Sequence, residues 1–227
     1  MKLEYTIQKS IKRHKLTITV ERDRKVVVHA PKGISDETIR QVVESKRKWI
    51  YEKIGHAQKY QELPHPPGKE LVSGESAFYL GRQYRIEVVK TGLTGIQFSY
   101  RFLIPASQGK KKVEALREWY INKAKEKLVP RVKLHARELG VDVAEVKIVD
   151  NSYRWGSCTL KDNVNFNWRL IKAPMFVIDY VIVHELAHLI EANHTPRFWN
   201  IVRARTSTTD KAKAWLKEHG QLLEQAI

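Results

Sequence analysis

Residues 180–199 read YVIVHELAHLIEANHTPRFW and contain the pattern His184-Glu185-x-x-His188. Residues four apart on an α-helix lie on the same face, so the two imidazoles can reach one metal ion. Glu185 stands beside the first histidine, where its carboxylate can contact a metal-activated water without binding the metal. We therefore expect this stretch to form the active-site helix of a metal-dependent hydrolase.

His194, six residues after His188, is the expected third ligand. A catalytic zinc ion usually has three protein ligands and a water, and two histidines leave such a site one ligand short. The gap is longer than one helical turn, so the chain must leave the helix and fold back. The HExxH-x5-H spacing predicts one zinc ion per chain, bound by His184, His188 and His194, with Glu185 as the base that activates the zinc-bound water.

The helix that carries this motif is expected to be buried, because residues 174–192 are apolar on nearly every face. Burying an ionised glutamate and two imidazoles costs several kcal/mol unless another group pairs with them. A bound metal ion provides that partner. The apolar context therefore favours a metal site over a chance match to the motif.

Sequence blocks around the motif carry a resemblance to a known family. They read RWGSC (154–158), NWRLIKAP (167–174), DYVIVHELAHL (179–189) and NHTPRFW (193–199). Together they resemble the YgjP-like metallopeptidase domain family, a zincin group similar to the SprT-type proteases. The resemblance covers nearly the whole chain, with its specific signature in about residues 152–200. It implies an α+β fold in which a small twisted sheet lies over the HExxH helix, and it implies peptidase activity.

The rest of the chain suggests two parts. Residues 1–105 are expected to be β-rich with one helix at about 35–60, capped by Ser35 or Asp36. Residues 106–227 are expected to form the zincin-like hydrolase domain, beginning with a long helix that Pro130 should kink or split. The proline-rich residues 63–68 (LPHPPG) read as a linker. Other expected elements are strands at 15–20, 25–30, 77–80, 84–89, 95–104, 145–149 and 164–170, and helices at 112–139, 174–192, from 196 and after 208.

Four polar residues near the motif are candidates for substrate binding. Asn165 or Asn167 could donate a hydrogen bond to a developing oxyanion, and the edge of their strand could pair an extended peptide. Arg154 could bind an oxyanion or a phosphate, and Tyr180, one turn before His184, could polarise a substrate carbonyl. The alternative for each is a structural role in packing. Asp179 and Glu191 are candidates to orient a histidine ligand, with solvent exposure as the alternative for both.

The charge distribution leaves the substrate open. The chain has 41 Lys and Arg against 25 Asp and Glu, a net charge of +16. The excess lies in residues 1–60 and 101–140, whereas residues 141–227, which hold the motif, are nearly neutral with 11 against 10. A basic surface attracts nucleotides and nucleic acids. Besides a peptidase acting on peptides or proteins, the alternatives are a nucleotide phosphoanhydride hydrolase of the pyrophosphatase type and a DNA-associated protease recruited by its basic surface.

Cysteine content and hydropathy bear on the compartment. Cys158 is the single cysteine, so no internal disulfide can form. No stretch approaches 18 uninterrupted apolar residues, and the first residues lack the apolar core of a signal peptide. These features predict a cytoplasmic protein without a membrane partner. They leave its oligomeric state open.

Overall fold

The computed structural model describes residues 3–11, 13–21, 24–55, 70–90, 92–151 and 154–224. The chain forms two compact units, Met1–Pro66 and Pro67–Ile227. Both contain helices and strands, which confirms the expected α+β class. The expected linker at 63–68 lies outside the described residues. No described helix is long and apolar enough to cross a bilayer.

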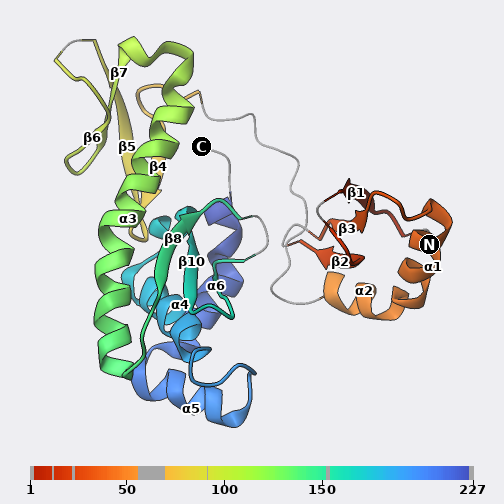
Figure 1. The fold of residues 1–227 in the computed structure, drawn as a ribbon. Helices are drawn as coiled ribbons and strands as arrows, with labels where there is room; N and C mark the ends of the chain where they lie inside the picture. The colour runs from red at the N-terminus through yellow and green to blue at the C-terminus, as the bar shows by residue number, and fades with distance from the viewer. Residues whose placement is uncertain are drawn as a thin grey trace. The chain divides into compact units, whose positions relative to one another are not determined.

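The described residues of unit 1 (Met1–Pro66) form three strands and two helices that share one apolar core (Figure 1). The central strand β3 pairs with β1 in parallel and with β2 in antiparallel fashion. Alternating apolar residues such as Val26, Val28 and Ala30 turn one face of β3 toward Ile39 and Val43 of the first helix. The elements are β1 (Thr6–Ser10), β2 (Thr17–Val20), β3 (Val26–Pro31), α1 (Asp36–Ser45) and α2 (Arg47–Ile54).

The helical region of unit 1 differs from the expected single helix. Ser35 caps α1 as predicted, because its hydroxyl accepts a hydrogen bond from the N–H of Thr38 at 3.2 Å. At Lys46 the backbone leaves helical geometry (φ −103°, ψ 7°), so residues 36–54 form two helices. Strand β1 was not expected from the sequence. It completes the sheet on the side of β3 opposite β2.

The described residues of unit 2 (Pro67–Ile227) form two sheets and four α-helices. The first sheet has the strand order β4-β5-β7-β6, and the second has the order β8-β10-β9. The strands are β4 (Ser76–Tyr79), β5 (Arg82–Val89), β6 (Gln97–Phe98), β7 (Phe102–Pro105), β8 (Glu145–Val149), β9 (Gly156–Cys158) and β10 (Asn163–Asn167). In the second sheet β10 is central, parallel to β8 and antiparallel to β9.

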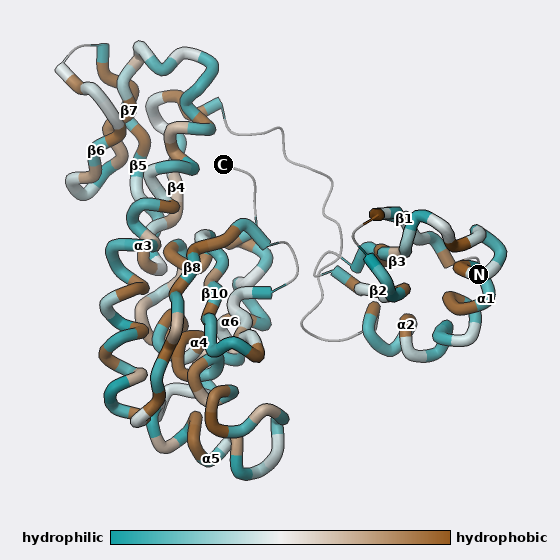
Figure 2. The backbone as a smooth tube through the Cα atoms, in the orientation of Figure 1, coloured by the Kyte–Doolittle hydropathy of each residue, from teal (hydrophilic) through white to brown (hydrophobic). Residues whose placement is uncertain are grey.

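A long helix, α3 (Lys112–Leu139), extends along both sheets of unit 2 (Figure 1). Hydrophobic and hydrophilic residues alternate along it, as expected for a helix with one buried face (Figure 2). The helix continues through Pro130, so the expected split does not occur. Leu128 and Val132 are fully buried on either side of the proline, and this packing holds the two halves together. The hydroxyl of Tyr120 donates a 2.6 Å hydrogen bond to the carbonyl of Phe78 and ties α3 to β4.

The compact units divide at residues 66 and 67, whereas the sequence suggested a division at 105. The reason lies in the core of unit 2. Residues of the first sheet, such as Ile86 and Phe102, pack in the same apolar cluster as α3 and the C-terminal helices. Strands β4 to β7 therefore belong to the body that carries the histidine motif. The C-terminal helices are α4 (Met175–Ala187), α5 (Pro196–Arg205) and α6 (Thr209–Glu224).

Candidate metal centre

Helix α4 places the first two histidines. Of its 13 residues nine are buried, so neighbouring elements fix the helix on most sides. The helix ends at Ala187, with His188 as its C-cap, rather than at residue 192 as expected. Burial and the four-residue spacing turn His184 and His188 toward one side, with their ring centroids 5.0 Å apart.

A short turn after α4 brings back the third histidine. The N–H of Glu191 donates to the carbonyl of Ala187 at 2.9 Å, which closes the turn. The chain then enters α5 through Thr195, whose hydroxyl accepts from the N–H of Phe198, and Pro196 follows at the first helical position. His194 precedes this cap. The start of α5 therefore fixes the position of His194 over the end of α4.

The three histidines form one cluster, with a ring nitrogen of each within 4.8 Å of the others. The Nε2 atoms of His184 and His194 are 3.1 Å apart. Two nitrogens bound to one tetrahedral zinc at ~2.0–2.1 Å lie about 3.3 Å apart, so the spacing fits a shared ion. The Nδ1 of His188 lies 3.3 Å from the carbonyl oxygen of Glu191. Donation by Nδ1 leaves Nε2 free to bind a metal. The donor set and its spacing fit a metal ion.

The protonation of the cluster also suits a metal. Burial, the neighbouring His188 and His194, and the charge of Lys213 lower the pKa of His184 to about 3. Burial, His188 and Lys213 also lower the pKa of His194. The neutral imidazole is the form that binds metal. These histidines are therefore in the binding form at neutral pH.

Glu185 lies next to the cluster, with 7% of its surface exposed. Burial raises its pKa to about 7, although the charge of Arg154 and a backbone hydrogen bond from Cys158 act in the opposite direction. A carboxyl group with a pKa near the working pH can both accept and return a proton. Its environment is thus suited to general base and acid chemistry.

Gly156 of β9 makes room for this glutamate. A β-carbon at residue 156 would lie 2.5 Å from Cγ and 2.7 Å from Oε1 of Glu185. Real β-carbons do not approach other atoms so closely, so only glycine fits at this point of the strand. The sequence contains a usable signal, because glycine inside a strand often marks a close approach of another group. The sequence interpretation did not assign Gly156 a role.

The strand next to the motif is β9 rather than β10. Strand β10, which carries Asn165 and Asn167, pairs with β8 on one side and β9 on the other. Both of its edges are occupied, so the expectation that its edge receives a peptide is wrong. Strand β9 has a single strand neighbour among the described residues. It is the strand of this sheet that borders Glu185 and has an edge without a strand.

The two asparagines make hydrogen bonds within the fold. The Nδ2 of Asn165 donates to the hydroxyl of Ser157 at 3.2 Å. Asn167 is 1% exposed; its Nδ2 donates to the carbonyl of Asn151 at 2.6 Å and its Oδ1 accepts from the N–H of Arg169 at 3.0 Å. These contacts join β10 to its neighbours and cap the short 3₁₀ helix Trp168–Lys172.

Arg154 and Tyr180, the other two candidates for substrate binding, differ in solvent exposure. Arg154 is exposed, and its charge reaches Glu185. Tyr180 is 7% exposed, and its ring centroid lies 5.8 Å from that of His184. Burial, with smaller effects of Glu185 and Asp210, raises the pKa of Tyr180 to about 12. Both residues therefore lie close to the cluster.

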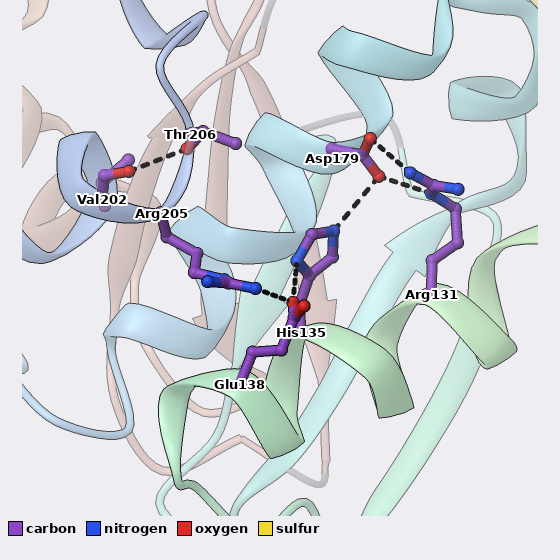
Figure 3. Close-up of polar contacts among 7 residues, drawn as sticks. All are labelled: Arg131, His135, Glu138, Asp179, Val202, Arg205 and Thr206. Atoms are coloured by element: carbon purple, nitrogen blue, oxygen red, sulfur yellow. Dashed lines mark hydrogen bonds and ion pairs between the residues drawn. The ribbon is translucent and has the colours of Figure 1, made fainter.

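A polar network connects α3 with the helices that carry the histidines (Figure 3). Asp179 of α4 accepts hydrogen bonds from Arg131 at 2.5 Å, and its Oδ1 lies 3.3 Å from the Nε2 of His135. Glu138 pairs with Arg205 at the end of α5 and lies 3.3 Å from the Nδ1 of His135. Asp179 thus pairs with α3 instead of a histidine of the cluster. The network fixes α4 and α5 relative to each other through α3.

Two further residues near the cluster were missed by sequence reasoning. The ring of Trp199 stacks on that of His194 with centroids 5.6 Å apart, and Lys213 of α6 lies above the indole. Trp199 belongs to the NHTPRFW block, so its sequence position offered a signal. Lys213 lies outside every motif, and only the tertiary structure brings it to the site.

Comparisons with known proteins identify the family of the chain. The family model described as YgjP-like, metallopeptidase domain, matches residues 14–219. The zymogen of abylysin from Pyrococcus abyssi is 16% identical over 44% of this chain and 99% of its own, with a TM-score of 0.35. The zymogen of jannalysin from Methanocaldococcus jannaschii is 20% identical over 42% of this chain and 97% of its own, with a TM-score of 0.36. No curated protein matches the chain. Because the family model spans nearly the whole sequence and the three histidines form a cluster able to hold a metal, the chain belongs to the YgjP-like metallopeptidase domain family.

Proposed function

We propose that this protein is a zinc-dependent peptidase in which Glu185 is the catalytic base. The observation that carries the proposal is the convergence of three histidine nitrogens within 4.8 Å, beside a buried glutamate. His184, His188 and His194 would hold the ion, which matches the three-ligand set of a catalytic zinc site. The proposal includes a zincin-like arrangement for unit 2 and, from the single cysteine, a cytoplasmic location.

The zinc ion and Glu185 would have separate roles in the reaction. Zinc, when bound, acts as a Lewis acid toward the substrate carbonyl and the attacking water. The carboxylate of Glu185 takes a proton from that water and returns it to the amine that leaves. The N–H of Cys158 and the nearby charge of Arg154 favour its ionised form, while burial favours its protonated form. This balance lets Glu185 serve both proton transfers.

Strand β9 would orient the peptide. Trp155 accepts a backbone hydrogen bond from Asn167, and Thr159 donates one to Asn163, so both face β10. Alternation along a strand then turns the N–H and C=O of Gly156 toward the other edge. An extended substrate can pair with that edge by strand addition. Arg154, two residues before this strand, would contact the bound peptide.

The test is metal content and turnover of three purified proteins. Wild type should hold about one zinc per chain and hydrolyse peptides derived from casein. Glu185→Gln should keep the metal and lose turnover by roughly 10²–10⁴-fold, the usual contribution of a general base. Glu191→Gln is the matched control, because Glu191 contacts His188 through its carbonyl. It should keep both metal and turnover.

The same proteins distinguish the rival functions. Hydrolysis of nucleoside triphosphates without cleavage of peptides would contradict the peptidase proposal. Unchanged turnover in Glu185→Gln would contradict the assigned base. A wild-type protein that takes up no zinc on reconstitution would contradict both the peptidase proposal and the role of Glu185 as its base.

A further inference from the structure

Lys213 lies next to the histidine cluster without a carboxylate partner. Its Nζ lies 4.4 Å from the centroid of the Trp199 ring, which stacks on His194 at 5.6 Å and lies 5.8 Å from the ring of His184. Asp210, one turn earlier on α6, is 3.7 Å from Arg203 instead. Among the described residues no ion pair joins Lys213 to an acidic side chain.

The position of this ammonium group is unfavourable for the metal. Its Nζ lies over the indole that stacks on His194, so the ammonium group is separated from the histidine cluster by one aromatic ring. By Coulomb repulsion it opposes a cation held by these histidines. A cation over an indole contributes only ~0.5–1 kcal/mol at an exposed site, and an uncharged side chain would also pack on the ring. Unfavourable electrostatics of this kind are concentrated at functional sites.

A bound anion would offset the repulsion between Lys213 and a metal ion. The site would combine the charge of a bound metal with Lys213, which lies over the ring stacked on His194, and with Arg154, whose charge acts on Glu185. Glu185, 7% exposed, is the buried acidic group beside the histidines. A negatively charged group bound beside His194 would meet Lys213 directly and would be attracted by the field of the whole site.

We propose that Lys213 binds an anionic group of the substrate, so that the site selects peptides with a carboxylate close to the scissile bond. This inference rests on the proposed peptidase function and names its substrate class. The carboxylate is either the side chain of an acidic residue or the free C-terminus of the peptide. Both present the same chemistry to the ammonium group, and the experiment distinguishes them.

The experiment measures kcat/KM for matched peptides. One series places Glu or the isosteric Gln at each position around the cleaved bond, and a second pairs C-terminal acids with their amides. Wild type should prefer the charged peptide at one position by about fivefold to twentyfold, the size of a single charge-assisted contact. Lys213→Met should abolish this preference, so that the Glu and Gln peptides are cleaved with equal kcat/KM. Lys213→Glu should reverse the preference in favour of a Lys peptide.

Lys211→Met is the matched control. Lys211 is on the same helix and also lies over an aromatic ring, with its Nζ 4.9 Å from the centroid of Phe176. Its charge does not contribute to the pKa shifts of His184, Glu185 or His194. The Lys211→Met protein should keep the full preference for the charged peptide.

A binding measurement tests the inference without turnover. Zinc-loaded Glu185→Gln protein is titrated with the Glu and Gln peptides by calorimetry, with and without Lys213→Met. Tighter binding of the Glu peptide that depends on Lys213 and weakens with salt supports the inference. A Glu-to-Gln ratio that Lys213→Met leaves unchanged, in binding and in turnover, overturns it. Failure of the wild type to cleave any peptide would overturn the proposed function, whereas equal cleavage of both peptides would overturn only the role of Lys213.

Discussion

Gly156 and Glu185 are in such close contact that a β-carbon on residue 156 would overlap Cγ of the glutamate at 2.5 Å. The strand and the buried helix α4 thus confine the carboxylate between them. The N–H of Cys158, two residues further along β9, adds a hydrogen bond to the same group. The orientation of the proposed base depends on a glycine in a different element.

Gly156→Ala should therefore reduce activity strongly and stability moderately. The new methyl group must displace Glu185, and overpacking of this kind costs ~1–3 kcal/mol. We expect kcat to fall by about 100-fold, within the range for losing a general base, while zinc content is unchanged. Steady-state kinetics, metal analysis and thermal denaturation measure the three effects.

A double-mutant cycle shows whether Gly156 acts through Glu185. In a Glu185→Ala background the clash is absent, so Gly156→Ala should have little further effect on stability or residual activity. Gly95→Ala is the control, because nothing lies within 4 Å of a β-carbon there and the backbone is not left-handed. A full penalty from Gly156→Ala in the Glu185→Ala background would mean that the glycine acts independently of the glutamate.

Zinc should stabilise the folded protein through His194. A ligand that binds only the native state at 100 times its Kd adds about 2.7 kcal/mol. Thermal denaturation with EDTA and with excess zinc should show a higher Tm for the metal form, and His194→Ala should remove most of this shift. His219→Ala is the comparison, since His219 lies on α6 and stacks on Trp215 away from the cluster. An equal zinc shift in wild type and His194→Ala would contradict the three-ligand site.

Asp179 should make stability sensitive to acid. Burial raises the pKa of Asp179, but hydrogen bonds from His135 and Arg131 outweigh burial and hold it below its ordinary value of 3.8. A carboxyl group with a depressed folded-state pKa stabilises the protein fully above its unfolded value, and the contribution is lost as the pH falls through the folded value. Urea denaturation between pH 3 and pH 7 should show this loss below about pH 4.

Asp179→Asn should remove that acid-dependent component and lower the free energy of unfolding at pH 7 by ~1–3 kcal/mol, because it leaves Arg131 without its carboxylate. Glu126→Gln is the control, since Glu126 pairs with Lys123 at the surface with 48% of its side chain exposed. It should change stability by less than about 0.5 kcal/mol. An unchanged pH profile in Asp179→Asn would show that the α3–α4 contact does not contribute.

Arg154→Gln should lower kcat/KM for peptides by about tenfold, the value of one charge-assisted contact near 1.4 kcal/mol. Arg154 is exposed, so the variant should keep the wild-type Tm and zinc content. Arg82→Gln, an exposed arginine of β5 in the same unit, is the control and should match wild type. A loss of stability equal to the loss of activity would assign Arg154 a structural role.

Sequence patterns gave good predictions where local chemistry decides the structure. The strand expected at 145–149 is β8, the helix expected from residue 196 is α5, and Ser35 caps α1 as predicted. Predictions failed where packing overrides local preference. Pro130 does not split α3, and strands β4 to β7 join the core of unit 2 instead of that of unit 1. In both cases, contacts between residues far apart in the sequence decide the structure. Local periodicity carries no information about such contacts.

The sequence by itself predicted the three histidines of the cluster and the family. The spacing of His184, Glu185 and His188 fixes their common side of a helix, because 3.6 residues make one turn. The blocks around them identify the family that the whole-chain match shows. Only the tertiary structure decided what surrounds this set: Gly156 against Glu185, Lys213 over Trp199, and α3 tied to α4 through Asp179. Each of these contacts joins residues from different elements, and their positions depend on how the whole core packs rather than on any local pattern.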